Sequence, residues 1–191
     1  VGHITATPVL DDVNPMQSTQ ITRMNNNRWA VVFGNGYNSE NQRPVLLVQY
    51  LDNNKELLRI PVVGTVDTPG AGLAKDNGLS APRLMDINSD GRPDIAYAGD
   101  NQGNLWKFDL TNIDDTQWKV AFNGKPLFTA LGPIALNATT RTVPQPITVA
   151  PTAVPNDRKM EVGSGTSKTA VDVGGVMVSF GTGRNVDATY P

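Results

Sequence analysis

The sequence predicts an all-β protein built from β-propeller-like repeats, each a blade of four antiparallel strands. Two observations support this prediction. Short apolar runs alternate along the chain with a period of two, and a similar succession of runs occurs three times in the 191 residues. The 18 glycines and 14 prolines lie mostly between these runs, where turns are expected. This pattern favours many short strands over helices.

The alternation of side chains is clearest in the segment 29–33. Trp29, Val31 and Phe33 would face one side of a strand, and Ala30 and Val32 the other. The segments 95–98 and 105–110 alternate in the same way. Because successive side chains of a strand point to opposite faces, each of these segments is predicted to be a β-strand.

The repeats share one order of parts: a strand opened by proline, a buried strand ending in a glycine turn, a hairpin partner and an outer strand. The first repeat is predicted over about 4–66, the second over about 79–130 and an incomplete third over about 147–191. The opening strands are predicted at 6–12, 81–86 and 150–154, and the outer strands at 57–60 and 118–122. A single blade cannot cover both of its faces, so the blades must stack, and three unequal units predict a partial propeller.

Residues 131–175 differ in composition from the repeats. They are rich in Ala, Thr, Pro, Gly and Val and contain no aromatic residue. We expect them to form a long, irregular and partly mobile excursion within the third repeat. An open β-sandwich is the alternative architecture for the chain.

The charge and the side-chain inventory exclude several classes of function. The 16 basic and 18 acidic residues are scattered, so nucleic acid is not an expected partner. No apolar run approaches the roughly 20 residues that cross a bilayer. Cysteine is absent and His3 is the single histidine, predicted to be an ordinary surface residue. Because acid–base and metal catalysis often use imidazole, a non-enzymatic protein is predicted.

The three tryptophans, Trp29, Trp106 and Trp118, are predicted to anchor the core rather than to form a ligand platform.

The nine residues from Asp86 to Asp94 predict a contiguous calcium-binding loop. Alternate positions carry oxygen donors: the side chains of Asp86, Asn88 and Asp90, the backbone carbonyl of Arg92 and the side chain of Asp94. Calcium is a hard cation that takes about six to eight oxygen ligands. The all-oxygen set disfavours zinc and copper.

The turn in this loop is predicted at Gly91, because glycine adopts a positive φ without steric cost. The loop differs from an EF-hand, since its twelfth position is Tyr97 in a predicted strand instead of a bidentate glutamate. We expect the ion to stiffen the turn, because three carboxylates brought together repel one another without it. An acidic, solvated turn without an ion is the alternative interpretation.

The run from Asp86 to Asp109 resembles the C-terminal propeller of the PilY/PilC family of type IV pilus biogenesis and tip-adhesin proteins. Its most specific part is the pair of stretches Tyr97-Ala98-Gly99-Asp100 and Gly103-Asn104-Leu105-Trp106. The segments 77–82 and 178–184 add to the resemblance, which covers about half of the chain.

The resemblance implies a secreted protein at the bacterial surface or pilus tip, associated with the outer membrane. It implies a role in pilus assembly by opposing retraction, with calcium as the control, and roles in twitching motility and surface attachment. The implied partners are type IV pilus components, such as minor pilins and the tip complex, and host or abiotic surfaces. The family's calcium ligands correspond to Asp86, Asn88, Asp90, Arg92 through its backbone, and Asp94.

Two other functions fit the sequence. One is a quinoprotein-type dehydrogenase, a propeller with recurrent runs like that from Gly103 to Asp109. Its calcium would be bound by residues from different blades, often beside paired cysteines, whereas the ligands here are contiguous and cysteine is absent. The other is a calcium-stiffened extracellular interaction module without any connection to pili.

Overall fold

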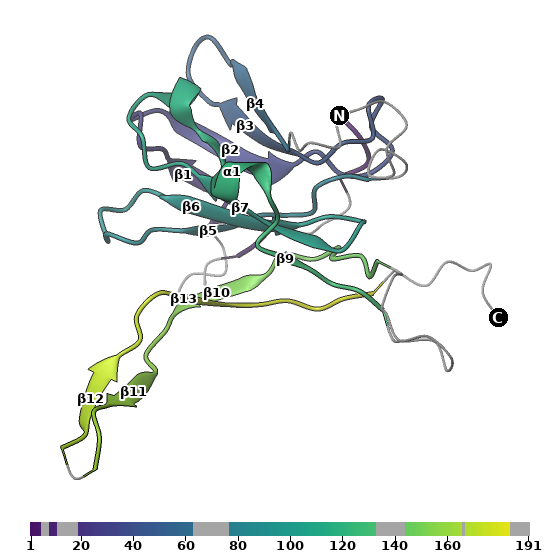
Figure 1. The fold of residues 1–191 in the computed structure, drawn as a ribbon. Helices are drawn as coiled ribbons and strands as arrows, with labels where there is room; N and C mark the ends of the chain where they lie inside the picture. The colour runs from purple at the N-terminus through teal and green to yellow at the C-terminus, as the bar shows by residue number, and fades with distance from the viewer. Residues whose placement is uncertain (5–7, 11–18, 63–76, 133–143, 166, 184–191) are drawn as a thin grey trace, which may run out of the picture.

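Three antiparallel sheets lie one above another in the computed structural model, which describes residues 1–4, 8–10, 19–62, 77–132, 144–165 and 167–183 (Figure 1). The first sheet takes its strands in chain order: β1 (Ile21–Arg23), β2 (Trp29–Gly34), β3 (Val45–Tyr50) and β4 (Leu57–Pro61). The second repeats this order with β5 (Arg83–Met85), β6 (Ile95–Gly99), β7 (Asn104–Asp109) and β8 (Lys119–Val120), and β9 (Phe128–Thr129) also pairs with β7. Four-stranded antiparallel units of this kind are propeller blades, so the predicted fold class is confirmed.

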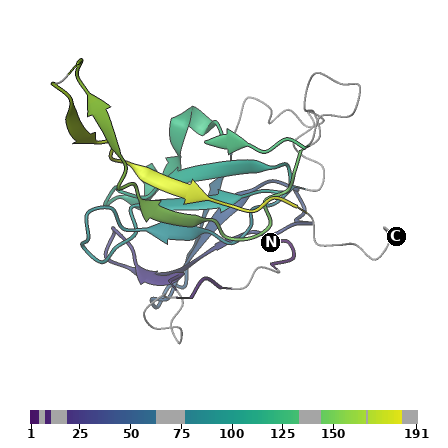
Figure 2. The same cartoon turned by 90° about the horizontal axis from the view of Figure 1, so that it is seen from below.

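The third sheet is smaller. β10 (Thr152–Pro155) pairs with β13 (Val176–Ser179), and Ala153 stands opposite Val178. Between them, β11 (Lys159–Val162) and β12 (Thr169–Asp172) form a hairpin that projects away from the stacked sheets (Figures 1 and 2).

The segment 131–175 is therefore less irregular than predicted. Its described part contains three strands, and in β11 the apolar Met160 and Val162 alternate with the charged Lys159 and Glu161. This is the same period-two pattern that predicted the other strands, over a shorter length. Residues 133–143 of the segment lie outside the described residues.

Two short helical segments join β7 to β9: the 3-10 turn Asp115–Gln117 and α1 (Ala121–Gly124). Phe122 and Asn123 in α1 both have a φ of 55°, so α1 is a tight turn rather than a regular helix. The outer strand predicted at 118–122 is consequently shorter and consists of β8 alone. Within the described residues, no helix has the length and hydropathy to cross a membrane.

The main core lies between the first and second sheets. It contains buried residues from both sheets and the segments beside them: Met24, Ala30, Val32, Leu46, Val48, Tyr50, Ile60, Val62, Leu79, Ala96, Ala98, Trp106, Phe108, Leu110, Trp118 and Val120. A smaller cluster of Leu105, Ala130 and Ile147 is covered by Val178 and Phe180 next to the third sheet. Each sheet thus buries a face against its neighbour, as stacked blades must.

The prediction for the tryptophans is confirmed at two positions and wrong at one. Trp106 and Trp118 are 3% and 5% exposed, whereas Trp29 is 56% exposed. β2 turns Ala30 and Val32 toward the core, which places Trp29 on the other face at the first position of the strand. His3 is exposed, as predicted.

The opening strand of the first repeat also differs from the prediction. The strand that pairs with β2 is β1, with Ile21 opposite Val31, whereas most of the strand predicted at 6–12 falls on residues that the structure does not describe. Residues 5–7 and 11–18 lie outside the described residues. β1 and β2 are joined by a turn over 24–28, hereafter the β1–β2 turn. The N–H of Met24 donates to the carbonyl of Arg28 (2.9 Å), and Asn27 has a φ of 68°.

Candidate metal centre

The predicted calcium loop connects β5 to β6 and is organised by Asp86. The carboxylate of Asp86 accepts hydrogen bonds from the backbone N–H groups of Ser89 (2.7 Å), Asp90 (3.3 Å) and Gly91 (2.7 Å). Three successive N–H groups therefore point at one side chain, and the loop curls around it.

The next two oxygen-bearing side chains repeat this arrangement on a smaller scale. Asn88 Oδ1 accepts the N–H of Asp90 (2.9 Å), and Asp90 Oδ1 accepts the N–H of Arg92 (2.9 Å). Gly91 has a φ of 82°, and a Cβ built there would meet nothing within 4 Å. The backbone conformation, and not the space available, requires glycine at this position, as predicted.

Asp94 is held differently from the other loop residues. It is only 4% exposed. Its backbone continues the sheet, since its N–H donates to Met85 (2.9 Å) and its carbonyl accepts the N–H of Leu110 (2.9 Å). Its Oδ2 accepts the N–H of Ile87 (2.9 Å), which brings the last residue of the loop back to the second.

A side chain from the first sheet braces this end of the loop. Asn25, in the β1–β2 turn, donates from Nδ2 to the carbonyls of Pro93 (3.0 Å) and Leu110 (2.9 Å) and to Asp94 Oδ1 (3.3 Å). The sequence did not predict this contact, because Asn25 precedes Asp94 by 69 residues. The only signal was a run of three asparagines between two predicted strands.

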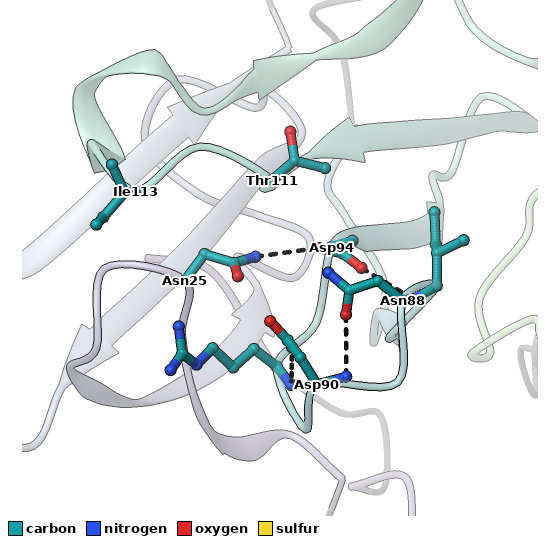
Figure 3. Close-up of a pocket in the computed structure, with 8 residues that line it drawn as sticks. Asn25, Asn88, Asp90, Asp94, Thr111 and Ile113 are labelled. Atoms are coloured by element: carbon teal, nitrogen blue, oxygen red, sulfur yellow. Dashed lines mark hydrogen bonds between the residues drawn. The ribbon is translucent and has the colours of Figure 1, made fainter.

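These groups border an open hollow of about 460 Å³ (Figure 3). The hollow is lined by Asn25, Ile87, Asn88, Asp90, Arg92, Asp94, Thr111 and Ile113. In the close-up, the side chains of Asn88 and Asp94 lie next to each other, and Asn25 extends toward Asp94 from the opposite side. Four of the five predicted ligand residues thus meet at one hollow. The fifth, Asp86, is not among the lining residues, and its Oδ2 accepts the N–H of Gly91 within the loop.

The segment after β7 also lines this hollow. The sequence did not predict this contribution. Thr111 donates from its hydroxyl (2.6 Å) and its backbone N–H (3.1 Å) to Asp109 Oδ1. Burial acts to raise the pKa of Asp109, but the Thr111 hydrogen bonds and the charges of Lys119 and Lys107 together hold that pKa below its ordinary value. Thr111 is therefore fixed in place beside the hollow.

The donor set fits a hard divalent cation. Asn88, Asp90 and Asp94, whose side chains carry oxygen, line the hollow together with Arg92, and no histidine, cysteine or methionine is among the lining residues. Among the residues that the structure describes, no three His, Cys, Asp or Glu side chains alone form a metal-binding group. A cation here would therefore need amide and backbone oxygens as well as carboxylates, as calcium loops allow and zinc sites rarely do.

Stacked four-stranded antiparallel sheets, with an oxygen-rich loop between the first two strands of one of them, define this chain as part of a β-propeller with a candidate cation site. The chain belongs to the PilY1 β-propeller family, since the sequence profile described as "PilY1 beta-propeller domain" matches residues 13–188. The predicted resemblance is thereby confirmed.

Similar proteins agree with this family. The type IV pilus biogenesis factor PilY1 of Pseudomonas aeruginosa strain PAO1 is 36% identical over 187 residues, which cover 88% of this chain and 14% of that protein. A homologue from Xylella fastidiosa strain Temecula1 is 34% identical over 88% of this chain and 10% of its own length. The crystal structure of the P. aeruginosa PilY1 C-terminal domain matches with a TM-score of 0.61 and 34% identity, covering 86% of this chain and 31% of that one. The chain thus spans a small part of these relatives.

Proposed function

We propose that this chain is the calcium-binding propeller portion of a type IV pilus biogenesis protein at the bacterial surface. In this proposal it supports pilus assembly by opposing retraction, and calcium in the loop 86–94 controls that activity. Twitching motility and surface attachment would depend on it through the assembled pilus. Its partners would be pilus components such as the minor pilins and the tip complex.

The observation that carries the proposal is the order of the loop itself. Asp86, Asn88 and Asp90 each accept a backbone N–H from within the loop, and Asp94 is held against its start. This order supports an ion site, because backbone N–H groups already hold oxygen-bearing side chains in place at alternate positions of the loop, as a calcium loop requires. When bound, calcium would be held by the side chains of Asp86, Asn88, Asp90 and Asp94 and by the Arg92 carbonyl, and it would supply positive charge that stiffens the turn.

The relatives are named as pilus biogenesis factors and not as dehydrogenases, which supports a non-enzymatic role over the quinoprotein alternative. The contiguity of the predicted ligands points the same way.

We expect protein stripped with a chelator to bind one calcium ion and to gain stability. At free calcium of about a hundred times Kd, the gain in the free energy of unfolding should be about 2.7 kcal/mol. Isothermal titration calorimetry and thermal melts measure the two effects. Asp90→Ala should abolish both, because it removes a carboxylate from the hollow.

The matched control is Asp157→Ala, which removes an equal charge at an exposed position outside the loop and should change neither result. Wild-type protein that binds no calcium and melts at the same temperature with and without it would contradict the calcium site. In cells, Asp94→Ala should lower pilus number and twitching, and unaltered pili in that strain would argue against a regulatory ion.

A further inference from the structure

The β1–β2 turn contacts the second repeat on two sides. On one side, Asn25 reaches the loop 86–94 through Pro93 and Asp94. On the other, Asn26 donates from Nδ2 to Asp115 Oδ2 (2.9 Å) and to the hydroxyl of Tyr50 (2.7 Å). The turn is therefore held between the calcium loop and the segment that follows β7.

The contact made by Asn25 is buried, because this side chain is 8% exposed and Asp94 is 4% exposed. An amide group carries two hydrogens, and here three acceptors lie within 3.3 Å of Nδ2. The two shorter bonds fix the carbonyls of Pro93 and Leu110, and the third reaches Asp94 Oδ1. The Asn25 amide thus contacts Pro93, which precedes Asp94, and Leu110, which is the strand neighbour of Asp94. It also contacts the Asp94 carboxylate.

The carboxylate of Asp94 is consequently shared between two parts of the fold. Oδ2 accepts a hydrogen bond from Ile87 of the same loop, and Oδ1 accepts one from Asn25 of the first sheet. Each oxygen keeps a lone pair for a cation. A cation that fixes this carboxylate would therefore also fix one of the hydrogen-bond acceptors of Asn25, Asp94 Oδ1.

We infer that Asn25 is a positioning residue for Asp94 and that it couples calcium occupancy to the contact between the first and second sheets. This inference rests on the proposed function of the loop. Coupling between two events is reciprocal: if calcium tightens the contact of Asn25 with Asp94, then loss of that contact weakens calcium binding by the same factor. The groups that orient metal ligands have effects of this kind, typically tenfold or more in affinity.

Hydrogen–deuterium exchange of the full wild-type protein tests the coupling without any substitution. The N–H groups of Met24 and Asn27 are hydrogen-bonded within the β1–β2 turn, to Arg28 and Met24 respectively. Saturating calcium should slow their exchange several-fold, together with that of the loop. The hairpin of β11 and β12, which projects away from the stacked sheets, should exchange at the same rate with and without calcium.

Three variants identify the residue that carries the coupling. Asn25→Ala should weaken calcium affinity by about tenfold and remove the calcium-dependent protection of the turn. Asn26→Ala is the matched control: it removes the contact with Asp115 from the same turn and should leave the affinity within about twofold. Asn25→Asp keeps the size of the side chain but places a second carboxylate against Asp94. Positioning predicts weaker binding for this variant, whereas a purely electrostatic effect predicts tighter binding.

The outcomes separate this inference from the proposed function. If wild-type protein binds calcium but the turn exchanges at the same rate, or if Asn25→Ala binds as tightly as wild type, the coupling is wrong and the calcium site stands. Equal losses of affinity in Asn25→Ala and Asn26→Ala, or tighter binding by Asn25→Asp, would also overturn the positioning role. If wild-type protein binds no calcium, both proposals fall.

Discussion

Replacing Asp100 with alanine is expected to destabilise the protein by about 3–5 kcal/mol. The Asp100 side chain is fully buried and accepts hydrogen bonds from five N–H groups. These come from the backbones of Gln102 and Asn104, the side-chain amides of Asn77 and Asn104, and the indole of Trp106 at 2.8 Å. Without the carboxylate, several buried donors lose their acceptor, and each unsatisfied group costs about 1–3 kcal/mol. Urea denaturation followed by tryptophan fluorescence measures the loss.

Asp172→Ala is the control for this prediction. Asp172 is 75% exposed at its side chain and lies 3.8 Å from Lys159. Exposed ion pairs contribute little, so this variant should stay within about 0.5 kcal/mol of wild type. If Asp100→Ala were equally mild, the hydrogen bonds to Asp100 would not stabilise the second sheet.

The sequence predicted features that depend on neighbouring positions. β2 and β7 follow from alternation of apolar residues, and the hydrogen-bonded turn at 86–94 follows from oxygen-bearing residues at every second position before a glycine. In the structure, Asn88 and Asp90 make the local hydrogen bonds that such spacing implies. Local geometry can be read from local sequence because these contacts span only two to five residues.

Features that depend on distant partners were not predicted. Asn25 resembles any asparagine in a turn until the second repeat places Asp94 beside it. Trp29 and Trp118 carry the same large apolar side chain, so both were predicted in the core. The pleat of β2 turns Trp29 outward. The strand Ile21–Arg23 was not predicted because it has only three residues, too few to reveal a period. In each case the deciding contact is tertiary.

Replacing Gly34 with alanine is expected to destabilise the protein by about 3 kcal/mol. Both the local sequence pattern and a tertiary contact support this expectation. From the sequence alone, Gly34 is predicted to end a buried strand. In the structure, the backbone of residues 79–80 packs closely against Gly34. A Cβ on Gly34 would lie 2.1 Å from the carbonyl oxygen of Ser80 and 2.3 Å from that of Leu79. Backbone cannot move aside as a side chain can, so the two segments would have to separate.

Separation would also break the hydrogen bonds that join these segments, from the N–H of Gly36 to Leu79 (3.0 Å) and from the N–H of Leu79 to Asn35 Oδ1 (3.0 Å). Gly181→Ala is the control, since a Cβ at Gly181 would meet nothing within 4 Å, and it should leave the urea midpoint almost unchanged. Equal midpoints for the two variants would mean that the segments 34–36 and 79–80 are not packed this tightly. A lower midpoint for Gly34→Ala alone would identify this approach as a point where the first repeat is fixed against the second, independently of the calcium loop.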